Sequence, residues 1–374
     1  MNKVVSFLSG ALSILLSIFL IGCKAPSGGG SDSNTNYNYL ESHGGMGGAV
    51  ASSGIKIGNN PMLDNTSEVY AIAPGNTGYF NGSSGHTDVP ENADAKYKGV
   101  FLKNRKVELS PFIIGQYEVT QELYESVMTN EKIGDKFLNA TPSKFCDSPA
   151  EGEFQNLRPV EQVSWYDAVY FCNALSEKTN LEKAYVITNV TVDEDGHIIY
   201  ADVEMDITKT GYRLPTEAEW EFAARGGDPT APEWNYLFSG HAAAEGMLYN
   251  DNNHYTSIPG FDAIGWGSYS SMHITHQTGI KTANALGLFD MSGNVWEMCH
   301  DTYDENDPTS NDNAYIQENI IKNPKGPSSG DKRVARGGSA GNSQAREFAV
   351  CFRTGSAKDR SGKNTGFRIA RSVK

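Results

Sequence analysis

The twelve residues from Gly287 to Met298, GLFDMSGNVWEM, constrain the fold more than any other stretch. Apolar side chains precede a Ser-Gly-Asn turn at 292–294, and Val295 and Trp296 then resume a buried or extended run. Asp290 and Glu297 flank this turn. A tight loop is therefore expected to bring two carboxylates together inside the protein.

Two interpretations of these carboxylates stay open. Carboxylate side chains with main-chain carbonyls between them are the oxygen ligands that Ca²⁺ prefers. Alternatively, Asp290 caps a turn and Glu297 pairs with a nearby arginine, which from the spacing alone is the more frequent outcome.

The same stretch resembles the GLYD-x-xGN-x-WEW signature of formylglycine-generating-enzyme (sulfatase-modifying factor) domains, a large variant of the C-type lectin fold. Further blocks follow in the order of that family: YEVTQELYESVM at 117–128, RPVEQVSWYDAVYFCNALS at 158–176, YRLPTEAEWEFAARGG at 212–227, RVARGGS at 333–339 and GFRIAR at 366–371. The resemblance implies an α+β fold with small twisted antiparallel sheets, a few helices and much irregular loop. It also implies a structural Ca²⁺ held by the side chains of Asp290 and Glu297 and the carbonyls of Gly293 and Val295.

The N-terminus predicts export. Lys3 precedes an apolar run from Val4 to Leu20, and Leu-Ile-Gly then leads into Cys23, the pattern of a secretory signal peptide whose end resembles a bacterial lipobox. We expect a lipoprotein signal peptide at 1–22, a lipidated Cys23, a flexible tether rich in Gly, Ser and Asn at 23–65, and a folded domain at 66–374. The chain would then be lipid-anchored in the cell envelope, on the outer membrane or cell surface. An uncleaved membrane anchor is the alternative.

The amino-acid composition limits which classes of ligand the protein can bind. The formal net charge of −14 argues against a nucleic-acid ligand, which requires clustered Lys and Arg. Cys172 lies on an apolar helix face and is expected to be a buried free thiol. The acids Glu217, Glu219 and Glu221 begin a helix, where they favour the helix dipole; a general acid is the less frequent alternative.

Local signals predict several elements. Thr120 is expected to cap one helix, Ser164 with Asp167 a second, and Thr216 with Glu219 a third. Alternation of apolar and polar residues on both sides of Asp195-Gly196, between 184 and 206, predicts a hairpin.

The segment between the RVARGGS and GFRIAR blocks decides whether catalysis is expected. In catalytic members of the family that the chain resembles, two cysteines five residues apart, between the RGGS and GFR blocks, bind copper and activate oxygen. The corresponding positions here are Asn342 and Glu347, and neither is a soft thiolate ligand. We therefore expect no formylglycine-generating activity. A metal-dependent oxidase or modifying enzyme acting on exported proteins is the alternative, with His273, His276 and His300 as candidate ligands, although His273 and His276 alone read as an ordinary surface pair.

Between those two blocks, residues 340–364 mix small, polar and charged side chains without a periodic stripe. Such a segment, framed by Gly337, Gly338 and the GFR block, is typical of a binding surface on a rigid scaffold; a solvated loop is the alternative. It also resembles the C-terminal variable region of treponemal variable lipoproteins, which diversity-generating retroelements mutate at template adenines. The candidate contact positions are Ala340, Gly341, Asn342, Ser343, Ala345, Arg346, Phe348, Thr354, Gly355, Ser356, Ala357 and Lys358.

The sequence therefore predicts a membrane-anchored, monomeric binding protein without enzymatic activity. Its partner would be a protein or another surface ligand, and nothing in the sequence argues for sugar binding. A lipoprotein scaffold within a larger envelope assembly is a third possibility.

Overall fold

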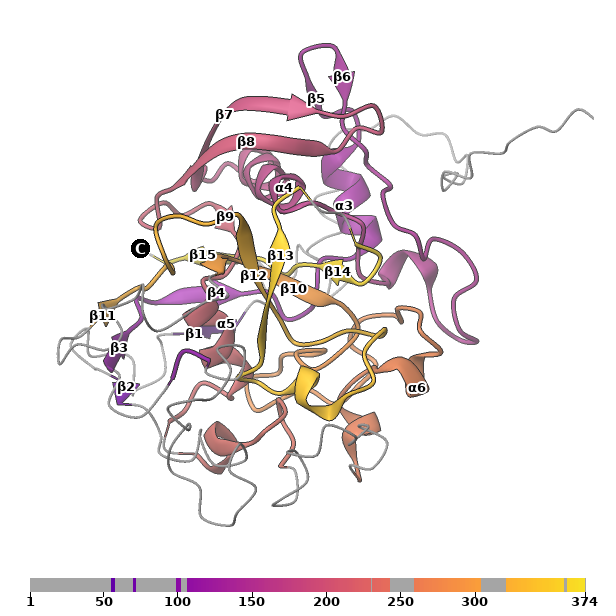
Figure 1. The fold of residues 1–374 in the computed structure, drawn as a ribbon, viewed down its shortest axis with the longest axis vertical. Coiled ribbons are helices and arrows are strands. Elements are labelled where there is room, and N and C mark those ends of the chain that lie inside the picture. The colour runs from indigo at the N-terminus through magenta and orange to yellow at the C-terminus, as the bar shows by residue number, and fades with distance from the viewer. Residues whose placement is uncertain are drawn as a thin grey trace, which may run out of the picture.

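The computed structural model describes residues 55–57, 70–71, 99–101, 106–229, 231–242, 259–303, 321–359 and 362–373. The predicted signal peptide, Cys23 and most of the predicted tether lie outside these ranges, whereas residues 55–57 of that tether form a strand. No helix among the described residues has the length and apolar character needed to cross a membrane. Small sheets, short helices and long irregular segments form one α+β fold (Figure 1), so the predicted fold class is confirmed.

Three of the α-helices begin where the sequence predicts a cap. Thr120 accepts a hydrogen bond from Leu123 N at the start of α3, and Ser164 and Asp167 form the capping box of α4. Thr216 and Glu219 do the same for α5. Among the described residues, the α-helices are α3 (Gln121–Met128), α4 (Trp165–Lys178), α5 (Glu217–Ala224) and α6 (Ser268–Ser271), and the 3₁₀ helices are η3 (Gln155–Leu157), η4 (Pro232–Asn235), η6 (Phe261–Ala263) and η7 (Ala345–Phe348).

The strands form several small sheets rather than one large one. The first, in the order β1-β4-β15-β9, joins β1 (Ile55–Ile57), β4 (Phe112–Ile114), β15 (Ala370–Ser372) and β9 (Tyr212–Arg213). Another joins β11 (Ile321–Lys322), β3 (Lys106–Glu108) and β2 (Tyr70–Ala71). The hairpins are β5 (Lys132–Ile133) with β6 (Lys136–Phe137), and β7 (Tyr185–Val192) with β8 (Ile198–Met205), which is the predicted hairpin.

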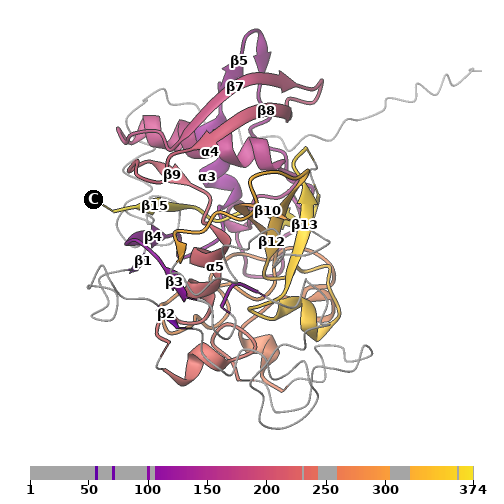
Figure 2. The same cartoon turned by 60° about the vertical axis from the view of Figure 1, so that its left-hand side comes forward.

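The sheet that matters for the site has the order β13-β12-β10-β14. It contains β10 (Trp296–Tyr303), β12 (Lys332–Arg336), β13 (Arg353–Ala357) and β14 (Thr365–Gly366). Pairing is antiparallel except between β10 and β14, and in the neighbouring sheet between β11 and β3. Figure 2 shows β13 at the outer margin of this sheet.

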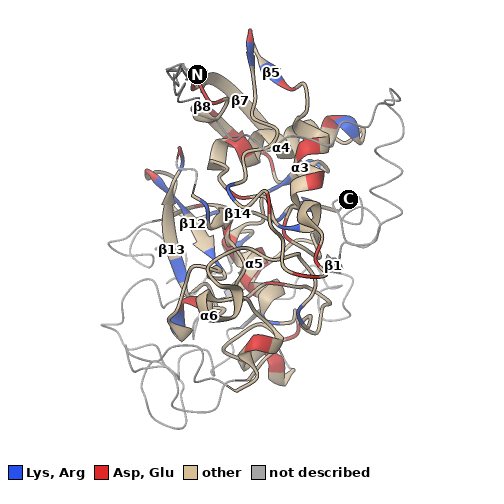
Figure 3. Ribbon diagram, turned by 90° about the vertical axis from the view of Figure 1, so that its right-hand side faces the viewer, with Lys and Arg blue, Asp and Glu red and all other residues tan. Residues whose placement is uncertain are grey.

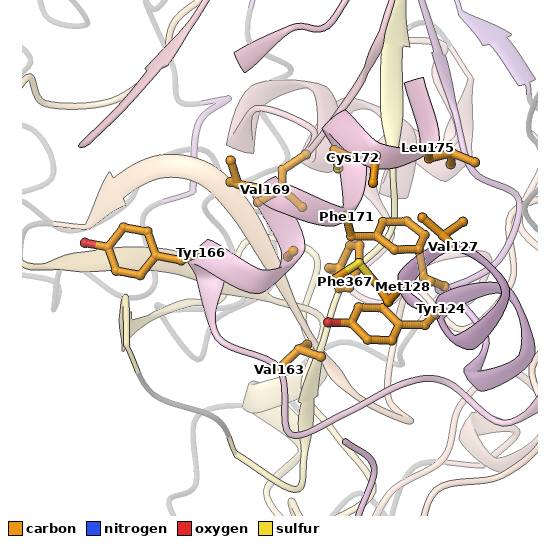
Figure 4. Packing of buried hydrophobic residues seen from close by; sticks show 14 of the residues in the cluster. Tyr124, Val127, Met128, Val163, Tyr166, Val169, Phe171, Cys172, Leu175 and Phe367 are labelled. Carbon is orange, nitrogen blue, oxygen red and sulfur yellow. The ribbon is translucent and has the colours of Figure 1, made fainter. Parts of the chain in front are cut away.

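The core beneath the helices explains their apolar faces. Tyr124 of α3 stacks on Phe171 of α4 with ring centroids 5.2 Å apart, and Phe367 of the GFR block lies edge-on to both rings (Figure 4). Cys172 is fully buried in the same cluster as a free thiol, as predicted. The C-terminal segment thereby packs against helices that lie far earlier in the sequence.

Candidate functional site

The structure divides the twelve predicted contact positions into two groups. Gly341, Asn342, Ser343, Arg346 and residues 354–358 are partly exposed. Ala340, Ala345 and Phe348 are at most 1% exposed, so their prediction as contact positions is wrong. Side chains without solvent exposure are part of the packing of the segment and do not reach a ligand.

Phe348 shows why these side chains turn inward. Its ring lies 4.8 Å from that of Phe261, in a small apolar cluster that also contains Ala345, Cys351 and Phe352. Its carbonyl accepts a hydrogen bond from Ser292 Oγ at 3.0 Å. The cluster lies under η7, so the polar residues around Phe348 stay at the surface while its aromatic ring fills the space below.

Buried arginines fix the backbone of the segment. Arg336 Nη1 donates to the carbonyls of Val350 and Phe352, at 3.0 and 2.5 Å, and its Nη2 contacts Glu221 of α5. Gly337 and Gly338, which follow it, have φ of +91° and +77°, a region that side chains with a Cβ rarely adopt. The RGGS block therefore frames the segment, as the sequence predicts.

The first residue of β13 adds a second anchor. Arg353 is 5% exposed, and its Nε and Nη2 donate to the two carboxylate oxygens of Glu217, at 2.8 and 2.5 Å. Glu219 pairs with Arg213 at 2.6 Å, and Glu221 with Arg225 at 2.9 Å. The acids of α5 thus form buried ion pairs, a role that neither the helix-dipole nor the general-acid interpretation anticipates.

A short helix outside the predicted segment lies against it. Ser268 N of α6 donates to Asn342 O at 2.8 Å, and Ser271 Oγ donates to Ala340 O at 2.9 Å. Next to these bonds, Tyr269 is 57% exposed and Met272 is 80% exposed. Sequence reasoning missed both residues, because a single exposed aromatic in a polar loop leaves no periodic signal.

The predicted calcium residues lie in a buried cluster of charges. Glu297 is fully buried; Arg368 Nε and Nη2 donate to its two oxygens at 2.5 and 2.6 Å, and Trp220 Nε1 donates at 2.7 Å. In the structure Glu297 therefore has the arginine partner that the sequence predicts as the alternative to calcium. Asp290 does not cap its own turn, because its Oδ2 accepts a hydrogen bond from Gly279 N at 2.8 Å.

Negative charge exceeds positive charge in this cluster. Burial raises the pKa of Asp290 to about 6, with a further contribution from the charge of Glu297. Glu118 accepts hydrogen bonds from Asn294 Nδ2 and Val295 N, and burial followed by the charges of Asp290 and Glu297 raises its pKa well above the usual value. Three carboxyl groups thus lie within the influence of one guanidinium, that of Arg368, which donates to Glu297 alone among them.

The predicted calcium ligands fit this arrangement only in part. Asp290 Oδ1 is buried and accepts no hydrogen bond, and no described group donates to the carbonyls of Gly293 or Val295. The Glu297 carboxylate does not fit as a ligand as it is arranged, because three donors already occupy its oxygens. The calcium site stays a prediction that rests on three oxygens and the surplus of negative charge.

The positions of the copper-binding cysteines carry no thiols in this chain. Asn342 and Glu347 occupy the positions expected for the copper-binding cysteines, and the free thiols of Cys172, Cys299 and Cys351 are all buried. These residues do not fit a copper site.

The histidines are separated as well. His276 is 5% exposed and its Nδ1 lies 2.7 Å from Glu153 Oε1, so it is not the surface residue expected from the sequence. His273 is exposed, and His300 is buried beside Trp165, where burial lowers its pKa well below the usual value. Among the described residues, no three His, Cys, Asp or Glu side chains are grouped as metal ligands.

Comparison with known proteins gives the family. The profile of the Sulfatase-modifying factor enzyme 1-like domain matches residues 59–373. The chain belongs to this family. Two curated relatives of similar sequence are the chaperone protein LppX of Paenibacillus barcinonensis (36% identity, 58% of this chain and 74% of that protein) and the formylglycine-generating enzyme of Thermomonospora curvata (30% identity, 71% and 84%).

A solved structure of this sulfatase-modifying factor fold is also similar. Treponema denticola variable protein 1 aligns with 74% of this chain and 89% of its own, with 34% identity and a TM-score of 0.55. The resemblance to formylglycine-generating-enzyme domains, and within them to a treponemal variable protein, is thus confirmed.

Proposed function

We propose that this protein binds a ligand through the partly exposed residues of 340–358 and has no formylglycine-generating activity. The observation that carries the proposal is the division within this segment: its apolar side chains are buried and its backbone is held by buried arginines, while polar side chains remain exposed. A rigid frame with adaptable polar contacts is how binding surfaces are built. The likeness to a variable protein supports the same function.

The binding surface extends to α6. Tyr269 and Met272 are large exposed side chains beside the loop at 340–342, and aromatic and Met side chains are enriched at interface centres. We propose that they contact the ligand together with Asn342, Ser343 and Arg346. The absence of cysteines at 342 and 347 supports a role other than copper-dependent oxidation.

The proposal includes display at the cell envelope through a lipid on Cys23. The lipobox-like sequence supports it, and incorporation of labelled palmitate into the wild type but not into Cys23→Ser tests it. Labelling of both chains would contradict the lipid anchor.

Selection of ligands tests the binding function. A displayed library of random peptides is selected on the wild type and then offered to a variant in which Asn342, Ser343, Thr354 and Ser356 are all alanine. We expect the recovered peptides to lose most of their affinity for this four-alanine variant. Recovered peptides that bind both proteins equally would show that the segment is not the binding surface.

A further inference from the structure

The outer edge of β13 carries unpaired backbone groups. β13 pairs with β12 alone, and within the described part of the chain residues 354–357 make no other hydrogen bond. In an antiparallel pair, alternate residues direct their N–H and C=O groups away from the partner strand. The side chains here are Thr, Gly, Ser and Ala, all partly exposed and small, so another chain can approach this edge closely.

Charge is distributed unevenly over the chain. Residues 332–364 contain eight Lys and Arg against two Asp and Glu, whereas the whole chain contains 31 against 45. Figure 3 shows Lys and Arg positions in blue on the ribbons of β12 and β13. Two of these eight, Arg336 and Arg353, are buried in ion pairs with Glu221 and Glu217, and Arg360 lies outside the described residues. Arg333 and Lys358 still place positive charge beside the edge of β13, which favours an anionic partner.

Arg333 and Lys358 concentrate that charge at one end of β13. Arg333 pairs with Ser356 across the sheet, and Lys358 follows β13 as the first residue of the next turn. Burial and the charge of Arg333 lower the pKa of Lys358, while Asp331 has the opposite effect. No described carboxylate forms an ion pair with either residue, whereas Arg353, on the same strand, has Glu217.

Arg333 is also held in place for such a contact. Its guanidinium lies 3.9 Å above the Trp165 ring, and Nη1 donates to His300 O at 2.7 Å and to Thr302 Oγ1 at 3.2 Å. Its Nη2 donates to no described group. A fixed planar guanidinium with a donor to spare, beside the ammonium group of Lys358, suits a carboxylate.

We infer that β13 binds an extended acidic polypeptide segment, which adds a strand to the outer edge of the sheet and places a carboxylate between Arg333 and Lys358. This inference rests on the proposed function and names the class of its ligand. Addition of a strand draws affinity from main-chain hydrogen bonds and specificity from alternate side chains. It therefore allows residues 354 and 356 to vary without loss of the binding mode.

An acidic polypeptide explains both features of this edge, whereas a phosphate or a lipid headgroup explains only the charge. The test uses a labelled peptide of alternating Glu and Thr, measured by fluorescence anisotropy with the full domain at physiological salt. We expect binding of this peptide, no binding of its Lys-Thr counterpart, and loss of binding when the central amides of the Glu-Thr peptide are N-methylated.

Protein variants locate the contact. Lys358→Glu should weaken the Glu-Thr peptide by about tenfold or more, because a cation is replaced by a like charge. The same exchange at Lys132, which is exposed on the β5–β6 hairpin, should leave affinity unchanged. If both variants weakened peptide binding equally, the net charge of the protein would explain the loss of affinity, and the inference would be overturned.

Other outcomes separate this inference from the proposed function. Full binding of the N-methylated peptide, or equal competition by inorganic phosphate or anionic vesicles, would overturn the added strand. If the selected library peptides depend on Asn342, Ser343, Thr354 and Ser356 but the Glu-Thr peptide does not bind, the proposed function holds and the acidic strand is wrong. If no selected peptide depends on these residues, the proposed function itself fails.

Discussion

Phe348 illustrates how burial overrides the polar character of neighbouring residues. It directly follows the charged residues Arg346 and Glu347 in the sequence, yet it is fully buried against Phe261. Phe348→Ala should destabilise the domain by about 3–5 kcal/mol, because it removes a buried ring and leaves a cavity. Ser356→Ala, at a partly exposed position, should change stability by less than about 0.5 kcal/mol. Urea denaturation measures the stability of both variants. If Phe348→Ala were as stable as Ser356→Ala, Phe348 would not be a packing residue and could again be a ligand contact.

Asp290 makes the stability of the domain depend on pH. Because burial raises the pKa of Asp290 in the folded state to about 6, the folded state holds a proton that the unfolded state releases between about pH 4 and 6. Stability should therefore fall as pH rises through this window, and the cost is complete above pH 6. With a calcium chelator present, Asp290→Asn should be more stable than the wild type by about 3 kcal/mol at most above pH 6, and by much less near pH 4. If the gain in stability of Asp290→Asn were the same at these two pH values, the raised pKa of Asp290 would be contradicted.

Calcium should reverse part of that difference. If Ca²⁺ binds at Asp290 with the carbonyls of Gly293 and Val295, the ion stabilises the folded wild type. Thermal unfolding with and without calcium at neutral pH is then expected to show a rise in Tm for the wild type and none for Asp290→Asn. An equal rise in both proteins would place any bound ion elsewhere.

The helices were predictable because their signals are local. Caps at Thr120, Ser164 and Thr216 need only residues three positions away. The strand β13 was not predicted, because its sequence, RTGSA, has no alternation of apolar residues. It exists through its pairing with β12 and the bond from Arg353 to Glu217, contacts that are distant in the sequence.

The bond between β13 and α5 should be important for stability. Arg353→Met removes one partner of a buried ion pair, and we expect the free energy of unfolding to fall by about 3 kcal/mol. This is the lower end of the range for such pairs, because Glu217 keeps a second partner, Arg336, at 3.1 Å. Hydrogen exchange should also speed up in residues 353–357. Lys178→Met, which breaks the partly exposed pair with Glu131, is the control and should cost less than about 1 kcal/mol. Similar losses in the two variants would argue against a special role for the buried pair.

The arrangement of the whole domain followed from the order of its sequence blocks, whereas the interior of the site did not. The blocks at 158–176 and 366–371 supply α4 and Phe367, which pack in one buried cluster, and the block at 212–227 supplies α5, whose buried side chains belong to a second cluster. Which residues of 340–358 face solvent depends on the contacts of η7 with Phe261 and of α6 with the loop at 340–342. Those contacts join segments that no local pattern relates, so exposure there required the folded structure.

A scaffold of this kind should tolerate change at its exposed positions. The four-alanine variant at Asn342, Ser343, Thr354 and Ser356 should keep its Tm within a few degrees of the wild type, since exposed substitutions change stability by less than about 0.5 kcal/mol each and add when independent. Calorimetry measures this directly. A large fall in Tm would show that these polar side chains hold the fold together and are not free to serve a ligand.

The buried members of the segment limit how many different proteins this scaffold can produce. A mutational process that reached all twelve candidate codons would also alter Ala340, Ala345 and Phe348, which are packed in the interior. Gly355 is restricted too, because an added Cβ would lie 2.3 Å from the Tyr303 ring. A change at any of these positions disturbs the packing, so the fraction of variants that still fold becomes smaller. A lineage that protects these codons from change would therefore obtain more functional variants from the same number of mutations.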